Sequence, residues 1–304
     1  MPEPAIDGDH RALARLRRLW RRLRGTPDPT LLAAQRHRSF DAMAGILGWM
    51  LGLVRAEFPG FRIDGASALE IGTGKFLAHA VALRVCGNRR VVTIDKYRQL
   101  VPAAVRAALD RPVLARRFLS GFVAHDDYMA RWRELQATGF ALENLGAKGI
   151  EYRAPLTVEE LAREPDRFDL IFSYTVLEHV PPAELPSLLA AADRLLAPGG
   201  IAVHFVDLED HLDPTEKPFA FLEAGREWRD DFCGERGNRQ RFSEWRKLLT
   251  ASAPLDWRFP YVAVRHDAAL PARIDPAVQA IDEEDLRTTA FVAVAQKPGE
   301  RDER

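Results

Sequence analysis

Apolar residues along this chain fall into two patterns. Short, almost continuous apolar runs alternate with stretches in which apolar residues recur every three or four positions. The first pattern is typical of strands buried on both faces, and the second of amphipathic helices. We predict strands at 66–71, 91–94, 150–153, 168–174 and 201–206. Helical stretches at 75–85 and 185–196 lie between them, which predicts βαβ units around a parallel sheet.

Two segments are longer than the connections of a simple α/β unit. Within residues 98–149, the pattern predicts helices at 102–109, 113–122 and 126–137. Residues 209–242 form a second long connection, rich in polar and aromatic residues. Loops that leave the carboxyl ends of parallel strands cover the ligand crevice of such sheets. We therefore expect helical lid insertions. The alternative for 98–149 is a set of helices that only packs on the domain.

The pattern of residues in the N-terminal region predicts a basic amphipathic helix. In residues 11–24, leucines and Trp20 line one face and arginines cover the rest. Such a helix could contact an anionic membrane surface or a polyanion. The alternative, which we favour, is a helix docked on its own domain, because nothing else in the chain supports membrane attachment. We expect residues 1–64 to form a helical cap.

Composition narrows the classes of partner and compartment. With 304 residues and a formal net charge of −1, the chain has no global attraction to nucleic acid. Cys86 and Cys233 form neither a disulfide framework nor a metal-binding spacing, as is usual in a reducing compartment. No apolar run approaches the roughly 18 residues that span a bilayer, and the acidic N-terminus does not resemble a secretory signal. We therefore expect a cytoplasmic protein without a transmembrane segment.

Candidate chemistry concentrates where the first two strands end. Gly72 and Gly74 let the backbone turn tightly and approach a ligand, and Asp95 stands where a carboxylate can accept both hydroxyls of a ribose. Glu70 would repel a pyrophosphate but attract the ammonium group of an amino acid. S-adenosylmethionine carries that ammonium, a sulfonium and a ribose but no phosphate. The charge pattern therefore favours S-adenosylmethionine over a nicotinamide dinucleotide.

Five ordered motifs resemble those of class I S-adenosylmethionine-dependent methyltransferases, over roughly residues 65–297. They are Glu70-x-Gly72-x-Gly74, Asp95, Phe-Asp-Leu-Ile-Phe-Ser at 168–173, Val-Leu-Glu-His-Val at 176–180 and Leu-Leu-Ala-Pro-Gly-Gly at 195–200. The resemblance implies an α/β fold, a three-layer Rossmann-like sandwich with a seven-stranded, mostly parallel sheet and an antiparallel last strand. The last two strands then fall at 257–264 and 290–295, and residues 298–304 are left as a flexible tail. Phe76 stands where the family commonly has a third glycine.

The resemblance also implies which residues contact the cofactor. Lys96 would lie along the adenine, and the backbone amide of Ala154 would meet its edge. Ser173 and Tyr174 would pass beneath the methionine portion. The full expected set is Glu70, Gly72, Thr73, Gly74, Asp95, Lys96, Ala154, Ser173 and Tyr174.

Candidate proton acceptors follow the fourth and fifth strands. His179 could act as a general base, because imidazole titrates near neutrality, or could orient its loop by a structural hydrogen bond. Asp207, Asp210 and His211 come at the end of the fifth strand, where they could bind the acceptor or remove its proton. The alternative is a turn in which these side chains cap a helix.

A metal is not expected from the same motif. Some related enzymes bind a divalent metal through Glu-x-x-Glu-His, and Thr175 stands here at the first glutamate. His204 or His211 could compensate for that loss in principle.

Arginines and aromatic residues gather at 237–245. This combination suits a polar or acidic acceptor, with Arg239 or Arg241 holding a carboxylate or phosphate and Trp245 beside them. The alternative is a solvated face with ordinary ion pairs.

The sequence thus predicts an enzyme that moves the methyl group of S-adenosylmethionine to an O or N atom of a small-molecule or glycan-like acceptor. One alternative is an RNA or protein methyltransferase that docks through the basic N-terminal helix. The Asn/Asp-Pro-Pro-Tyr phrase of many base-N methyltransferases is replaced by Ser-Tyr-Thr-Val at 173–176. Another is a non-catalytic protein that binds S-adenosylmethionine.

Overall fold

The structure is a computed structural model that describes residues 39–109, 115–224, 233–253, 255–278 and 282–299. The basic helix predicted at 11–24 and the last residues of the charged tail lie outside the described residues. Of the helices described, none combines the length and the apolar character needed to cross a membrane.

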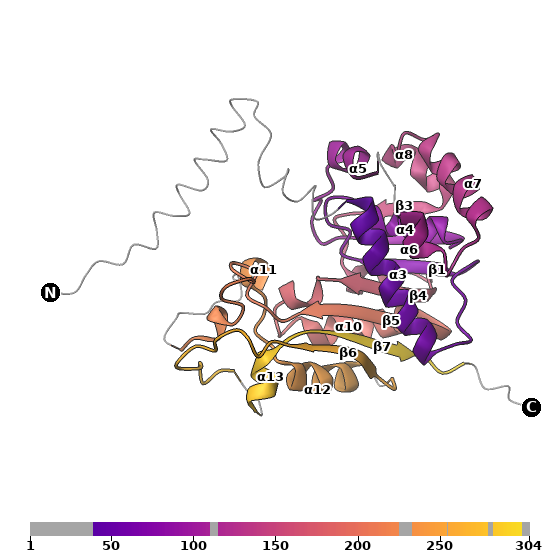
Figure 1. Cartoon of the computed structure of the whole chain (residues 1–304). Helices are drawn as coiled ribbons and strands as arrows, with labels where there is room; N and C mark the ends of the chain where they lie inside the picture. Colours follow the sequence, from indigo (N-terminus) through magenta and orange to yellow (C-terminus); the bar gives the residue numbers. More distant parts are fainter. Residues whose placement is uncertain (1–38, 110–114, 225–232, 254, 279–281, 300–304) are drawn as a thin grey trace, which may run out of the picture.

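A seven-stranded sheet forms the centre of the fold, in the strand order β3-β2-β1-β4-β5-β7-β6 (Figure 1). The strands are β1 (Ser67–Ile71), β2 (Arg90–Ile94), β3 (Ile150–Arg153), β4 (Phe168–Tyr174), β5 (Leu196–Asp207), β6 (Arg258–Val264) and β7 (Thr288–Gln296). The pairs β1–β2, β2–β3, β1–β4 and β4–β5 are parallel, whereas β7 runs antiparallel to β5 and β6. The predicted Rossmann-like sheet is confirmed, and the carboxyl ends of β1, β2 and β4 lie side by side.

Helices cover both faces of the sheet and complete three layers. One face carries α3 (Phe40–Glu57) and α4 (Ala78–Val85); the other carries α9 (Val158–Leu161), α10 (Leu185–Leu195) and α12 (Phe242–Ser252). On β4, Leu170 and Phe172 enter the core beneath α3 and α4, while Phe168 and Ile171 enter the opposite core. All four side chains are fully buried, which explains why this strand reads as a continuous apolar run.

The first insertion packs on the face that carries α3. It contains α5 (Pro102–Leu109), α6 (Ala115–Leu119), α7 (His125–Gln136), α8 (Leu142–Leu145) and the 3-10 turn η1 (Gly146–Lys148). α6 crosses α3 so closely that a Cβ atom on Gly48 would lie 2.5 Å from the carbonyl oxygen of Phe118. The ring of Trp132 on α7 packs against that of Phe40 on α3 in a tilted arrangement, with centroids 5.1 Å apart. The described part of this insertion therefore extends the helical layer, and its role as a lid stays a prediction.

The described part of the second insertion lies near the carboxyl ends of β4 and β5. α11 (Cys233–Arg236) packs against the 3-10 turn η2 (Leu177–His179), which follows β4. The 3-10 turn η3 (Ala220–Leu222) belongs to a small third core, and α13 (Glu283–Arg287) leads into β7. This arrangement brings the end of β5 and the segment around α11 next to the residues that follow β4.

Candidate active site

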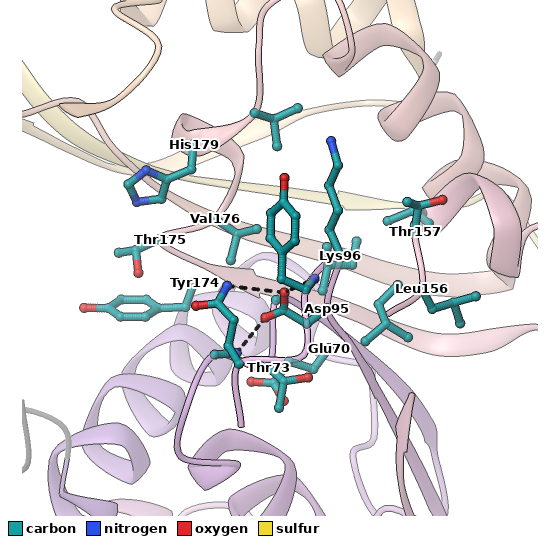
Figure 2. Close-up of a pocket in the computed structure, with 18 of the residues that line it drawn as sticks. Glu70, Thr73, Asp95, Lys96, Leu156, Thr157, Tyr174, Thr175, Val176 and His179 are labelled. Atoms are coloured by element: carbon teal, nitrogen blue, oxygen red, sulfur yellow. Dashed lines mark hydrogen bonds between the residues drawn. The ribbon is translucent and has the colours of Figure 1, made fainter. Parts of the chain in front are cut away.

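A cavity of about 760 Å³ opens at the carboxyl ends of β1, β2 and β4 (Figure 2). Its lining includes most of the residues expected to contact the cofactor, and His179. The expected residues in the lining are Glu70, Gly72, Thr73, Gly74, Asp95, Lys96, Tyr174 and His179. Figure 2 shows Leu156 and Thr157 on one side of Asp95, and Tyr174 and His179 on the other.

The Gly72–Gly74 turn links β1 to α4 at the floor of the cavity. Both glycines have positive φ angles, 85° and 62°. The Gly72 amide donates to the Ile94 carbonyl oxygen at 2.8 Å, and the Gly74 amide donates to Asp95 Oδ2 at 3.1 Å. A Cβ atom on Gly72 would lie 2.3 Å from Val176 Cγ2, whereas a Cβ atom on Gly74 would meet open space among the described residues. The turn therefore tolerates no side chain at Gly72.

The two glycines offer a matched test of this turn. We expect Gly72→Ala to lower the free energy of unfolding by roughly 1–3 kcal/mol more than Gly74→Ala, because both variants carry the left-handed strain but only the first adds a clash. Chemical denaturation followed by circular dichroism measures the difference. Equal stability of the two variants would show that Val176 yields without cost.

Two buried carboxylates stand at separate points of the cavity wall. Asp95 is 7% exposed, and its Oδ1 accepts from the Tyr97 amide at 2.9 Å. Glu70 is 2% exposed, and its Oε2 accepts from Thr93 Oγ1 at 2.7 Å. Thr73 Oγ1 donates in turn to Thr93 Oγ1 at 2.6 Å, since the Thr93 proton points to Glu70. These hydrogen bonds fix both carboxylates in orientation before any ligand binds.

His79 lies on α4 and lines the cavity, although it belongs to none of the motifs recognised in the sequence. Its Nδ1 donates to Glu70 Oε1 at 3.2 Å, and its ring meets those of Phe172 and Tyr174 edge-on. The ring is 7% exposed overall, and its Nε2 has no hydrogen-bond partner among the described residues. A histidine in the apolar first turn after the Gly-x-Gly loop was the available signal. Met43 of α3 also lines the cavity, and no local pattern marks it.

Two of the expected cofactor contacts lie outside the cavity lining, and a third, Lys96, is engaged by a carboxylate. Ala154 does not line the cavity, and the next residues, Leu156 and Thr157, form that wall instead. Ser173 is fully buried and also lies outside the lining. Lys96 reaches the cavity, but its Nζ donates to Glu184 Oε2 at 3.1 Å, and this hydrogen bond raises the pKa of Lys96. Lys96 therefore links the end of β2 to the start of α10 across the cavity wall.

Ser173 is bonded to His204 beneath the cavity. Ser173 Oγ lies 2.8 Å from His204 Nδ1, and burial lowers the pKa of His204 from 6.5 to about 4. His204 therefore belongs to the protein interior between β4 and β5, and it lies apart from the histidines at the cavity.

The neutral, buried His204 makes stability depend on pH. Because its folded pKa lies below its unfolded pKa of 6.5, the unfolded chain binds the proton first during acidification. The contribution of neutral His204 to the free energy of unfolding is therefore fully present above pH 6.5. It is lost as the pH falls from 6.5 toward 4. Between about pH 7.5 and pH 5, we expect the free energy of unfolding of the wild type to fall by roughly 2 kcal/mol more than that of His204→Gln. Urea unfolding at the two pH values measures both changes. Parallel losses in both proteins would contradict this account.

The catalytic candidates after β4 and β5 separate into two groups. His179 Nδ1 donates to the Cys233 carbonyl oxygen at 3.0 Å, and the His179 and His211 ring centroids are 4.7 Å apart. His211 Nε2 lies 3.5 Å from Asp207 Oδ2. Asp210, in contrast, is 1% exposed and pairs with the guanidinium of Arg236, whose Nε donates at 3.1 Å. The Asp210 carboxylate thus fastens α11 to the end of β5 in this structure, and its expected role toward the acceptor stays a prediction.

The three residues expected to bind substrate lie away from the cavity. Arg239 Nη1 donates to Asp275 Oδ2 at 3.1 Å. Arg241 is fully buried, where Nη1 donates to the Leu208 carbonyl oxygen at 3.1 Å and Nη2 to that of Thr288. Trp245 is fully buried in the core under α12. Neither Arg241 nor Trp245 reaches the surface, and Arg239 is held in an ion pair, so the expected contacts of these residues with a substrate stay a prediction.

Residues 48–252 match the protein family described as "Methyltransferase domain". The match spans more than half of the chain, and the protein belongs to this family. It is a class I S-adenosylmethionine-dependent methyltransferase.

Individual relatives are distant. The ubiquinone biosynthesis O-methyltransferase of Cereibacter sphaeroides is 38% identical over 79 residues, which are 26% of this chain and 29% of that protein. The match thus spans less than a third of that relative's length. A solved S-adenosylmethionine-dependent methyltransferase from Mesorhizobium loti shares 18% identity with a TM-score of 0.45, over 80% of this chain and 95% of that one. The N-methyltransferase NodS from Bradyrhizobium japonicum shares 15% identity with a TM-score of 0.38, over 82% and 93%.

Proposed function

We propose that this methyltransferase acts on a hydroxyl oxygen of a small-molecule acceptor that enters beside His179. The observation that carries the proposal is the hydrogen bond from His179 Nδ1 to the Cys233 carbonyl oxygen. A carbonyl can only accept, so the Nδ1 atom carries a proton, and in the neutral imidazole Nε2 is then the unprotonated nitrogen that a general base needs. An O-acceptor must lose a proton during methylation, and an imidazole on the cavity wall is suited to take it.

The opposite end of the cavity fits S-adenosylmethionine. Glu70 is placed to hold an ammonium group, and Asp95 to accept the ribose hydroxyls. The unsatisfied Nε2 of buried His79 borders the same space and offers one more polar contact. Leu156 would hold the base on the apolar wall. When bound, S-adenosylmethionine supplies the activated methyl group.

The acceptor side of the cavity has a mixed character. Met43, Phe76 and Tyr174 provide apolar and aromatic surface, while Thr175 and His179 provide polar atoms. This suits a ring or other apolar body that carries a hydroxyl group, rather than a strongly charged acceptor. The O-methyltransferase named among the relatives supports the same choice of atom.

The proposal is tested by transfer of an isotopically labelled methyl group from S-adenosylmethionine. The full chain is incubated with three matched acceptor panels, namely catechols and phenols, primary amines, and hydroxylated sugars. We expect labelled product with the first panel and a methyl–oxygen bond by mass spectrometry and NMR. Methylation of nitrogen or carbon instead would overturn the choice of atom. Binding of S-adenosylhomocysteine without turnover on any panel or on RNA would favour a non-catalytic binding protein.

A further inference from the structure

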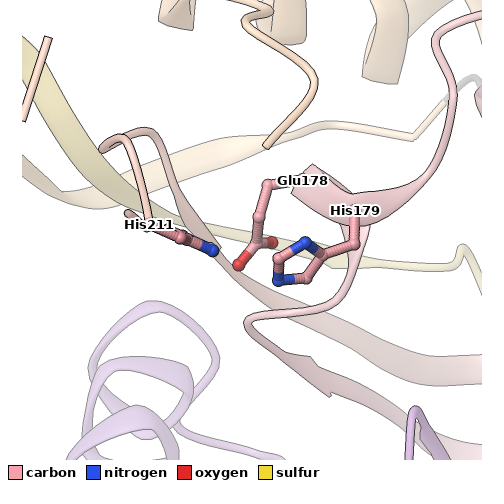
Figure 3. A group of neighbouring side chains, drawn as sticks. All are labelled: Glu178, His179 and His211. Atoms are coloured by element: carbon pink, nitrogen blue, oxygen red, sulfur yellow. The ribbon is translucent and has the colours of Figure 1, made fainter. Parts of the chain in front are cut away.

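We propose that Glu178, His179 and His211 bind a divalent first-row transition-metal ion at the wall of the cavity. Figure 3 shows the three side chains pointing toward one another. One ligand atom from each lies within 4.8 Å of the others. Metal bonds to imidazole nitrogen and carboxylate oxygen are about 2.0–2.2 Å long, so one ion can reach all three after small side-chain movements.

The backbone brings these residues together from two separate strand ends. Glu178 and His179 are neighbours in η2, and the Asn238 side-chain amide donates to the carbonyl oxygens of Leu177 and Val180 on either side of them, at 3.2 and 3.0 Å. His211 follows β5, and its amide donates to the Arg236 carbonyl oxygen at 3.5 Å. The segment around α11 therefore contacts both the residues after β4 and the residues after β5. Through these contacts, the segment around α11 fixes the backbone that carries the potential ligands.

A backbone carbonyl orients the His179 imidazole as such groups do around metal-bound histidines, and the Asp207 carboxylate lies near the His211 ring. A ligating histidine usually donates its other ring proton to a carbonyl or carboxylate. His179 Nδ1 donates to the Cys233 carbonyl oxygen, which directs the Nε2 lone pair away from that carbonyl. Asp207 Oδ2 lies 3.5 Å from His211 Nε2, close enough to steady that ring or to approach the ion itself. Glu178 is 1% exposed, so its carboxylate would bind the ion from the interior of the protein.

The donor set decides the class of ion. Two imidazoles and one carboxylate suit Zn²⁺, Co²⁺, Fe²⁺ or Mn²⁺, whereas Mg²⁺ and Ca²⁺ prefer oxygen ligands throughout. Three protein ligands leave coordination positions open, and His179 lines the cavity. Thr175 stands where related metal-binding enzymes have a glutamate. Here His211 would supply the third ligand, because the fold brings it close to Glu178 and His179. With an ion bound, His179 Nε2 would be a ligand and not a general base, and the ion would take over the role of making the acceptor hydroxyl acidic. That use of the ion rests on the proposed O-methylation, whereas binding of the ion does not.

Metal binding can be measured without acceptor or turnover. Tag-free full-length protein, stripped with chelator, is titrated with CoCl₂ and followed by visible absorption, and ZnSO₄ is then added as a competitor. We expect one Co²⁺ per chain, displaced by Zn²⁺. Glu178→Gln and His211→Ala should each weaken Co²⁺ binding by at least roughly 10- to 100-fold. The matched control is His266→Ala, which removes an exposed histidine and should bind as wild type does.

The same titration can overturn the proposal. Absence of a Co²⁺ absorption band in wild type, or equal affinity in wild type and His211→Ala, would show that the cluster is not a metal site. The His211 side chain is 21% exposed, so its variant is expected to fold, and retained S-adenosylhomocysteine binding by calorimetry confirms that it has. Because no methyl transfer is measured, this result stands apart from the test of the acceptor atom.

Discussion

Replacing His179 by alanine is expected to slow methyl transfer by roughly 10²- to 10⁴-fold, the usual contribution of a positioned acid–base group. Affinity for S-adenosylhomocysteine should stay unchanged, because Glu70 and Asp95 lie on other parts of the cavity wall. The expectation holds whether the imidazole takes the acceptor proton directly or holds an ion that makes the acceptor more acidic. Single-turnover transfer of labelled methyl gives the rate, and calorimetry gives the affinity.

The control for this variant is again His266→Ala, which removes an exposed imidazole outside the cavity lining. A His179→Ala rate within about tenfold of wild type would place proton removal elsewhere. A large loss of S-adenosylhomocysteine affinity would instead assign His179 to the cofactor side of the cavity.

Replacing Arg241 by methionine is expected to lower the free energy of unfolding by about 3–5 kcal/mol. The fully buried guanidinium donates to the carbonyl oxygens of Leu208 and Thr288, and so ties the residue after β5 to the first residue of β7. Burial lowers the pKa of Arg241 to about 10, which still leaves it charged at neutral pH. Methionine fills much of the space but leaves both carbonyl oxygens without their donor.

Arg246→Met, within the helix that begins directly after Arg241, is the matched control. Arg246 is exposed, and its loss should change the free energy of unfolding by less than about 1 kcal/mol. Both variants are compared by guanidinium unfolding. Equal stability of the two would mean that Arg241 is not an internal tie, and it would reopen a role for Arg241 toward the acceptor.

Most of the fold could be read from the sequence because its central strands are buried on both faces. The strands at 150–153 and 168–174 and the helix at 102–109 have the predicted bounds. The helix predicted from residue 75 begins at Ala78, because Leu77 adopts a left-handed conformation with φ of 57° and the turn around Gly74 uses more residues. Such a conformation is rare for leucine, and the local pattern gives no sign of it.

The cofactor side of the cavity was more predictable than the acceptor side. Glu70 and Asp95 lie next to the ends of parallel strands, whose position follows from the sheet. Ser173 and Tyr174 were expected together, but neighbouring residues of a strand point to opposite faces, and only Tyr174 reaches the cavity. His79 and Met43 come from helices, whose rotation against the sheet is set by packing that the sequence does not show.

Charged residues in the second insertion could not be placed from the sequence. Arg239 and Arg241 have the composition of an anion-binding segment, yet both are held by internal acceptors. Asp210 and His211 are adjacent, but one is bonded to Arg236 and the other faces His179. Composition alone does not distinguish an arginine that binds a ligand from one that satisfies buried carbonyl oxygens.

The central claim is that S-adenosylmethionine binds where β1 and β2 end, with Asp95 holding its ribose. Calorimetric titration of wild type and Asp95→Ala with S-adenosylhomocysteine, beside NADH, tests it most directly. We predict one S-adenosylhomocysteine bound per wild-type chain, no heat from NADH, and binding to folded Asp95→Ala that is weaker by roughly 1–3 kcal/mol, or about 5- to 150-fold. Equal affinity in the folded variant, or a wild type that binds NADH and not S-adenosylhomocysteine, would contradict the account.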